Sequence, residues 1–234
     1  MIFTAPANEI LKTLDPIIGV AGKEGEATFV FLGDTIETSL TDEAHIAMCN
    51  MIVDTFDLDN YERDGEEKIT VQMDKLISAL KFFGSDSVTI YTSGEEIIIE
   101  SEMAKRTLRM DGKPSFAKVQ NLTYDVNVSV SSNQLKKLRD LETISDGITF
   151  FLQNGKLVVG SYSDVETAEY RMEVGVYMDA RSTFPAEMLS DIVRRIPADD
   201  SVMISLGNDL PIALSFEYKA ARYKVYVAPR IETP

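Results

Sequence analysis

The 234-residue sequence has no tryptophan, a single cysteine (Cys49) and a single histidine (His45). One cysteine excludes an internal disulfide, so a reducing, cytosolic location is expected. No second His or Cys is present to complete the usual nucleophilic or zinc sites. The sequence also lacks a GxxxxGK phosphate loop and a GxGxxG motif. We therefore predict no enzyme activity, no cofactor and no metal. An enzyme that acts through carboxylates alone remains the open alternative.

Long apolar runs and basic residues are scarce. No run approaches the ~20 apolar residues that span a bilayer, and the N-terminus lacks the pattern of a secretory signal, so no membrane partner is expected. The chain has 23 Lys and Arg against 38 Asp and Glu, a net charge of −15. This acidity argues against binding nucleic acid through overall charge, because phosphate binding depends on Lys and Arg. The acidity is consistent with a need for solubility or with a salt-rich cytoplasm. Any role in binding nucleic acid must depend on where the Lys and Arg residues lie.

Four amphipathic segments have apolar residues at helical spacing. The first begins near Asn8, and the other three cover Met73–Phe83, Ser132–Thr143 and Pro185–Ile196. Gly84 and Pro197 are predicted stops, and Ser132 and Thr183 are predicted N-caps. In the third segment Leu135, Leu138 and Leu141 follow one another at a spacing of three.

Between these segments the pattern changes to period two and β-branched runs, typical of strands. The predicted strands are Thr28–Leu32, Thr35–Leu40, Ile46–Val53, Ser87–Thr92, Glu95–Ser101, Lys105–Met110, Gly147–Gln153, Lys156–Ser161, Thr167–Val174, Ser201–Leu206, Pro211–Tyr218 and Tyr223–Ala228. Turn signals such as Asn154-Gly155 separate them. The order strand, helix, three strands thus recurs four times.

This recurrence predicts an α+β fold of two similar domains, each a duplicated β-α-β-β-β unit. The weakly periodic stretch 111–125 is the predicted boundary, which gives domains at 1–112 and 126–234 and an interdomain connector at 113–125. A generic α+β protein without duplication is the alternative.

The helical segments are the only elements that lean positive, with eight basic residues against six acids. The eight are Lys12, Lys75, Lys81, Lys136, Lys137, Arg139, Arg194 and Arg195. Because the apolar face of each helix packs on the sheet, these bases project from the opposite face. Helices on one side of the sheets would give a basic surface suited to sequence-independent phosphate contact. Ordinary solvated helix faces are an equal alternative.

Three sequence motifs resemble proliferating cell nuclear antigen (PCNA), the DNA sliding clamp of archaea and eukaryotes. The C-terminal one joins the Leu210–Tyr218 strand to Tyr223–Val227 and Ala228-Pro229-Arg230-Ile231-Glu232. Asp42–Met48 and the stretch from Tyr61 to Met73 are weaker matches, the latter to archaeal members. The resemblance covers essentially the whole chain and agrees with the fourfold repeat.

The resemblance implies the DNA clamp fold: a trimeric ring with helices lining the hole, sheets outside, and the eight bases facing duplex DNA. Polymerase, clamp loader, ligase or nuclease would dock short peptides into an apolar pocket. The matching pocket positions are Thr41, His45, Val119, Leu122, Pro211, Tyr226, Ala228 and Pro229. Thr41 stands where relatives commonly have methionine, which implies a more polar hollow. His45 as a structural histidine, and Tyr226 as a packed strand aromatic, are the alternatives.

A ring needs free edge strands at its joints. We predict that the Lys105–Met110 strand, with Lys105, Arg106 and Arg109, forms one edge. The Thr167–Val174 strand, with Glu169 and Glu173 and with Glu166 just before it, is predicted to form the other edge. Head-to-tail pairing would then place a basic edge against an acidic one.

Several alternatives stay open at this point. A heterotrimeric or checkpoint-type clamp subunit, a viral clamp and a protein-interaction module unrelated to DNA all fit the composition. The resemblance implies a cytoplasmic, nucleoid-associated protein of an archaeon or its virus, or a nuclear protein in a eukaryote.

Overall fold

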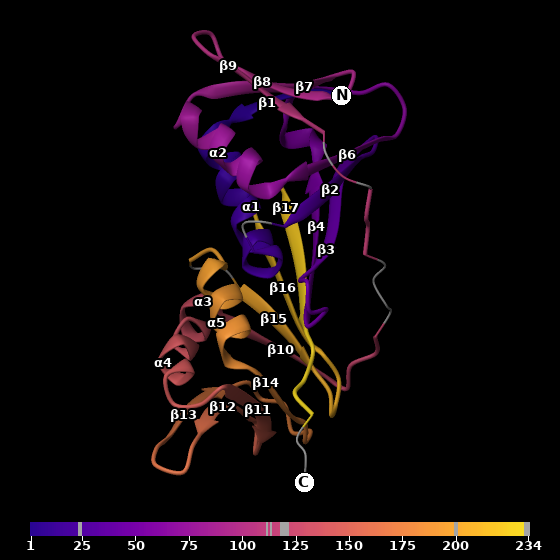
Figure 1. Ribbon diagram of the computed structural model, residues 1–234. Coiled ribbons are helices and arrows are strands. Elements are labelled where there is room, and N and C mark those ends of the chain that lie inside the picture. The colour runs from indigo at the N-terminus through magenta and orange to yellow at the C-terminus, as the bar shows by residue number, and fades with distance from the viewer. Residues whose placement is uncertain (23–24, 111, 113, 118–121, 199–200, 232–234) are drawn as a thin grey trace. The chain divides into compact units, whose positions relative to one another are not determined.

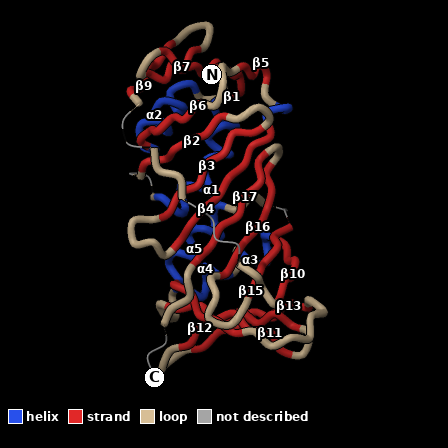
Figure 2. The backbone as a smooth tube through the Cα atoms, turned by 90° about the vertical axis from the view of Figure 1, so that its right-hand side faces the viewer, coloured by secondary structure: helices blue, strands red, loops and turns tan. Residues whose placement is uncertain are grey.

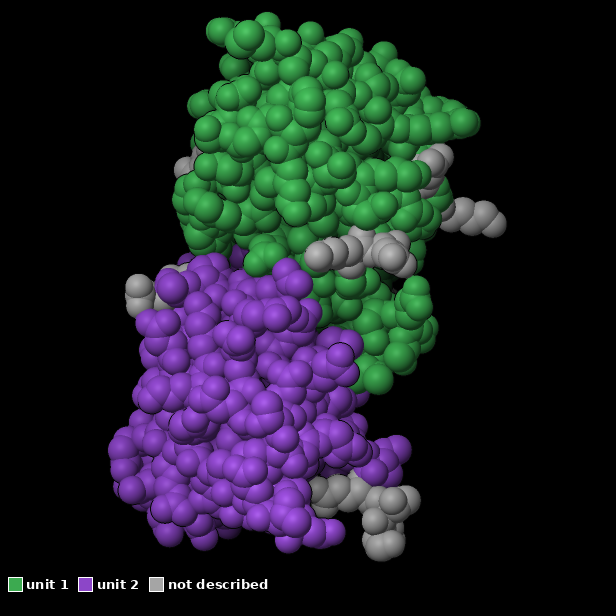
Figure 3. Space-filling model, turned by 60° about the vertical axis from the view of Figure 1, so that its left-hand side comes forward, with its two compact units in different colours: residues 1–119, 218–222 green, residues 120–217, 223–234 purple. Residues whose placement is uncertain are grey.

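The computed structural model describes residues 1–22, 25–110, 112, 114–117, 122–198 and 201–231. The chain forms two compact units (Figure 3). Unit 1 contains residues 1–119 together with 218–222, and unit 2 contains residues 120–217 together with 223–234. The short segment 218–222 thus belongs to unit 1, although the chain on both sides of it belongs to unit 2.

Unit 1 has two packed helices, α1 (Ala7–Ala21) and α2 (Met73–Phe83), among its described residues. A short 3₁₀ turn, η1, spans Thr55–Asp57. Its strands are β1 (Ile2–Pro6), β2 (Glu26–Phe31), β3 (Thr35–Thr41), β4 (Ala47–Asp54), β5 (Asp59–Glu62), β6 (Glu67–Gln72), β7 (Ser87–Ser93), β8 (Glu96–Glu100) and β9 (Lys105–Arg109). They pair in the orders β5-β1-β7-β8-β9 and β4-β3-β2-β6 (Figures 1 and 2).

Unit 2 repeats this plan with α3 (Ser132–Leu135), α4 (Leu138–Glu142) and α5 (Ala186–Arg195), of which α4 packs against α5. Its strands are β10 (Val126–Ser131), β11 (Gly147–Gln153), β12 (Lys156–Tyr162), β13 (Thr167–Glu173), β14 (Arg181–Pro185), β15 (Ser201–Leu206), β16 (Ile212–Tyr218) and β17 (Ala221–Val227). They pair in the orders β13-β12-β11-β14 and β10-β15-β16-β17.

The element order confirms the duplicated α+β fold. A strand, a helical segment and three strands occur four times, and β5 and η1 are the additions within the described chain. The four strands that lead into the helices, β1, β6, β10 and β14, had no predicted bounds. Their alternating burial is clear in β10, where Val126, Val128 and Val130 are buried between exposed residues. This alternation is the signature of a strand with one face in the core.

The third helical segment is not one continuous helix, as predicted, but two short helices separated at Lys136 and Lys137. The three leucines explain the difference: Leu135, Leu138 and Leu141 are all fully buried. A spacing of three places them in line only if the backbone tightens towards 3.0 residues per turn, the 3₁₀ geometry.

Both predicted N-caps are wrong. Ser131, not Ser132, caps α3: its hydroxyl accepts the Gln134 N–H, and the Gln134 side chain accepts the Ser131 N–H. This is a capping box, and its S-x-x-Q pattern was present in the sequence. Thr183 cannot cap α5, because it lies in β14, where its hydroxyl bonds that of Thr149 at 2.9 Å.

Candidate functional site

The eight predicted bases all lie on or between helices of the described chain. Six are exposed, while Lys136 and Arg195 are half-buried. Lys12 pairs with Glu9 on its own helix, and Arg194 and Arg195 pair with Asp191 on theirs. Helix α1 extends to Ala21 and therefore adds Asp15, so the helical segments hold seven acids, not six. The positive excess is smaller than the sequence suggested and rests mainly on α2 and the α3–α4 segment.

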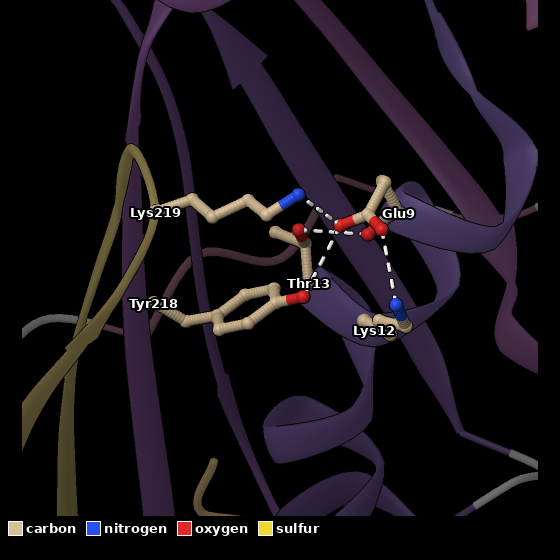
Figure 4. A network of polar contacts seen from close by, with 5 residues as sticks. All are labelled: Glu9, Lys12, Thr13, Tyr218 and Lys219. Carbon is tan, nitrogen blue, oxygen red and sulfur yellow. Dashed lines mark hydrogen bonds and ion pairs between the residues drawn. The ribbon is translucent and has the colours of Figure 1, made fainter. Parts of the chain in front are cut away.

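Glu9 on α1 is the centre of a polar network within unit 1 (Figure 4). Its carboxylate accepts hydrogen bonds from the Lys219 ammonium at 2.5 Å, Lys12 at 3.0 Å and the Tyr218 hydroxyl at 3.1 Å. Together these donors, with Lys219 first and Lys12 next, lower the pKa of Glu9 from 4.5 to about 2. Residues 218–222, the tip of the β16–β17 hairpin, are thereby fastened to α1.

This network predicts a pH effect on stability. Because the pKa of Glu9 is depressed in the folded state, its ion pairs stabilise the fold above pH 4.5, and this contribution is lost as the pH falls towards 2. Replacing Lys219→Met should raise the Glu9 pKa and flatten the loss of thermal stability between pH 5 and pH 2. Carboxyl NMR titration and thermal melts measure both, with Lys68→Met as the matched control. An unchanged Glu9 midpoint would contradict the assignment.

Strands β9 and β13 both lie at sheet edges, as predicted for the two joints. On β9, Arg109 is 3.6 Å from Glu95, and the Arg106 guanidinium lies 5.3 Å from the Phe82 ring centroid. On β13, Glu169 accepts hydrogen bonds from Arg171, and Glu173 is 2.8 Å from Lys156. Several of the predicted joint charges therefore already have a partner within the chain, which reduces what each can contribute to a contact with another molecule.

Exposed apolar side chains, which were not predicted from the sequence, lie beside both edges. Phe82 is 58% exposed beside β9, and Met103, in the turn before β9, is 94% exposed. Val165, in the turn before β13, is 95% exposed. Large exposed apolar residues at unpaired strand edges are typical of surfaces that become covered. The signal was an apolar residue within a charged turn, as in Ser163-Asp164-Val165-Glu166.

In unit 1, two of the predicted pocket residues lie close together: Thr41, the last residue of β3, and His45, on the tight turn that follows. The buried Asp42 carboxylate accepts the N–H groups of Ala44 at 3.2 Å and Ala47 at 2.7 Å. This turn holds His45 at a positive φ of 56° and exposes its ring, whose Nδ1 lies 3.3 Å from the Thr41 hydroxyl. Asp42 therefore explains the Asp-x-x-His pattern structurally, because it fixes the backbone that presents the histidine.

In unit 2, the C-terminal segment supplies other predicted pocket residues. Tyr226 is only 7% exposed, whereas Leu122, Pro211, Ala228 and Pro229 are half-buried. Burial and the neighbouring Tyr226 raise the pKa of Tyr124 to about 12. Beyond β17, the Arg230 N–H donates to the Thr183 carbonyl at 2.7 Å and its guanidinium pairs with Asp146. The segment is therefore anchored. Val119 lies outside the described residues.

Part of the predicted connector is fixed to unit 1. The Ser115 N–H donates to the Thr28 hydroxyl at 3.0 Å, and Ala117 exchanges hydrogen bonds with Ser39 of β3. Gly112 precedes this stretch at a φ of 120°, and a Cβ there would lie 2.6 Å from a Glu26 carboxylate oxygen. Glycine is therefore required for the chain to turn against β2.

The described residues give little support to other chemistry. They contain no group of three His, Cys, Asp or Glu side chains placed to hold a metal ion. Burial raises the pKa of the Cys49 thiol to about 12, so the thiolate that nucleophilic chemistry requires is suppressed. In the same portion of the chain, every helix is too short or too polar to cross a bilayer.

Comparison with known proteins identifies relatives over nearly the whole chain. The DNA polymerase sliding clamp of Pyrococcus horikoshii is 25% identical over 223 residues, covering 88% of this chain and 90% of that protein. The sliding clamp of Thermoplasma acidophilum is 25% identical over 222 residues, with the same coverage. No family model matches the chain.

Solved structures give the same result for the fold. A. fulgidus PCNA, in a structure described as having the C-terminal region of FEN-1 bound, has a TM-score of 0.89 at 21% identity. The match covers 100% of this chain and 99% of that one. PCNA from Thermococcus kodakaraensis has a TM-score of 0.84 at 18% identity, covering 98% and 99%. The PCNA2–PCNA3 complex of Sulfolobus tokodaii has a TM-score of 0.80 at 20% identity, covering 99% and 100%. The resemblance found in the sequence is confirmed.

Proposed function

We propose that this homologue of archaeal DNA polymerase sliding clamps, which has the fold of PCNA, is itself a sliding clamp: a non-enzymatic, cytoplasmic ring of three copies that encircles duplex DNA and tethers replication and repair enzymes. The observation that carries the proposal is the placement of exposed bases on the helices of an otherwise acidic chain with this fold. The two domains are 1–112 and 126–234, and the connector is 113–125.

The DNA-facing surface consists of the helices, with α2 and the α3–α4 segment contributing most. Lys75, Lys81, Lys137 and Arg139 are exposed there. Contacts of this kind neutralise phosphates and carry no sequence information. A ring holds DNA by enclosing it, so weak contacts are sufficient and favour sliding. The acidic remainder of the chain discourages DNA from binding elsewhere.

The joints of the ring are β9 of one copy and β13 of the next. Both are edge strands in the described chain, and the outer side of an edge strand can pair with a strand of another molecule. Lys105, Arg106 and Arg109 on one edge face Glu166, Glu169 and Glu173 on the other. The exposed Met103 and Val165 beside these edges would be covered by the same contact.

Partner enzymes dock a short peptide into an apolar hollow formed by Thr41, His45, Val119, Leu122, Pro211, Tyr226, Ala228 and Pro229. Support comes from the related A. fulgidus PCNA, whose structure is described with the C-terminal region of FEN-1 bound. Within unit 1 the Asp42 turn is fixed by hydrogen bonds, and within unit 2 the C-terminal segment is anchored through Arg230, so each part that contributes to the hollow has an ordered backbone. Such order reduces the entropy cost of binding.

The decisive test is topological. The protein is loaded on nicked circular duplex with a clamp loader, freed of unbound protein by gel filtration, and divided in two. We expect it to remain on the circle and to leave after a single cut, because only enclosure depends on closed ends. Equal retention on circular and linear DNA would refute encirclement.

Sedimentation of the purified chain without DNA decides between a homotrimer and a subunit of a mixed ring. A homotrimer sediments at three times the 26.0 kDa subunit mass when the chain is purified alone. A chain that stays monomeric until a second clamp chain is added would instead form a mixed ring. The related PCNA2–PCNA3 complex is formed from two different chains.

A further inference from the structure

Unit 1 contains an apolar cavity of about 420 Å³ that the proposed clamp function does not use. One wall consists of alternate residues of β1, among them Phe3 and Ala5, with Ile90 and Ile97 of the same sheet. The facing wall is the β4-β3-β2-β6 layer, which contributes Phe31, Met51 and Val71 among others. Helix α1 borders the space with Ile10 and Leu14. The cavity therefore lies between two sheets, where side chains normally interdigitate.

This volume is large for the interior of a small domain. Protein cores are packed like organic crystals and rarely leave voids larger than one water molecule. Its apolar walls offer few hydrogen-bonding partners to water. Pockets that bind small molecules have volumes of ~300–1,000 Å³ and mainly apolar walls. The volume and lining thus match a ligand site.

The polar residues that line the cavity lie at its solvent end. The Lys219 side chain is 60% exposed and that of Glu9 25%, whereas Val71 in the opposite wall is 1% exposed. Tyr218 and Thr13 complete this rim (Figure 4). Glu9 is bonded by two ammonium groups, those of Lys219 and Lys12. The rim network therefore carries one positive charge more than it carries negative charges.

We propose that this cavity binds a single-chain amphiphile with an anionic head, of the class of medium-chain carboxylates. The chain fills the apolar space between the sheets, and the carboxylate pairs with the Lys219 ammonium at the rim. The excess positive charge of the Glu9 network favours an anionic head over a cationic one. The inference rests on unit 1 alone and does not depend on ring formation or DNA binding.

Decanoate is the probe that tests the proposal. It is titrated into the intact protein while the methyl NMR signals of Ile36, Ile69 and Ile97, which line the cavity, are followed. We expect saturable shifts at these methyls before those of Ile148 and Ile204, which are buried in unit 2. Decanol and decyltrimethylammonium serve as neutral and cationic comparisons.

Two variants separate the chain site from the head site. Lys219→Met removes the ammonium but keeps an apolar stem, so decanoate should bind about tenfold more weakly while decanol is unaffected. Lys68→Met is the matched control for loss of one lysine. Ala5→Phe fills the space and should abolish binding of both probes. Circular dichroism and the unit 2 methyl signals verify that each variant is folded.

Absence of cavity methyl shifts up to the solubility limit of decanoate would overturn the proposal. So would shifts that persist in folded Ala5→Phe, because the probe would then bind elsewhere. If Ala5→Phe does not fold, the Lys219→Met comparison decides: equal weakening of decanoate and decanol, or of neither, also overturns it.

Discussion

Reversing the basic edge with Lys105→Glu and Arg109→Glu is expected to convert the ring to monomers at concentrations where the wild-type chain is assembled. Each exposed ion pair contributes ~0–1 kcal/mol, and a like-charge pair opposes association by a similar amount. Two reversals therefore cost about 2 kcal/mol per joint, which weakens each joint by about thirtyfold. Sedimentation equilibrium over a concentration series measures the change.

A second pair of charge reversals, on β13, tests whether β13 is the strand that β9 contacts in the neighbouring copy. Adding Glu166→Lys and Glu173→Lys to the same chain places an acidic β9 against a basic β13 and should restore the ring. Reversal of Lys68 and Lys224, exposed bases on other strands, is the matched control and should leave assembly intact. Salt should dissociate the wild-type joint and partly rescue the first variant, because both effects are screened within ~3 Å at 1 M. Assembly unchanged by the first pair would rule out the charged joint.

Local periodicity was sufficient for much of the fold. The bounds of α2 match the predicted Met73–Phe83, because one apolar face and the Gly84 stop lie in neighbouring residues. The Asn154-Gly155 turn is likewise local: both residues have positive φ, 52° and 78°, as a two-residue hairpin of this type requires. The strands predicted as edges, Lys105–Met110 and Thr167–Val174, correspond to β9 and β13, which are the outer strands of their sheets.

Periodicity was insufficient where two local rules compete. The spacing of Leu135, Leu138 and Leu141 was interpreted as an amphipathic α-helix, but burial of all three favours a tighter backbone and divides the segment. Thr183 has the chemistry of an N-cap, yet its strand pairing with Thr149 determines its role. In both places tertiary contacts override a preference that is correct for an isolated segment.

Contacts between distant residues could not be predicted at all. Glu9 and Lys219 are separated by 210 positions, and neither belongs to a motif. In the sequence, Glu9 is only one of the six acids set against the eight helix bases. Its strongest partner comes from a hairpin tip that belongs to unit 1 although the chain around it does not. The cavity could not be predicted from the sequence either, because residues from several separate strands form its walls.

Neutralising four helix bases is expected to weaken the salt dependence of DNA binding strongly. The changes are Lys75→Gln, Lys81→Gln, Lys137→Gln and Arg139→Gln. Each lost phosphate contact lowers the slope of log K against log salt by about 0.9, so four contacts lower it by about 3–4. The fall in affinity between ~50 and ~200 mM salt should then shrink by roughly 100-fold. Binding of the assembled protein to a short duplex, by anisotropy over a salt series, measures this.

The control for this experiment decides between a DNA-facing surface and overall charge. Gln at Lys68, Arg181, Arg222 and Lys224 removes the same four charges from exposed strand positions. If the overall charge of the chain governed binding, both sets would change the affinity alike, since net charge changes equally. Direct phosphate contact instead predicts a changed slope for the helix set alone. A parallel loss of slope in both sets, or in neither, would contradict helices that face the duplex and leave their bases as ordinary solvated side chains.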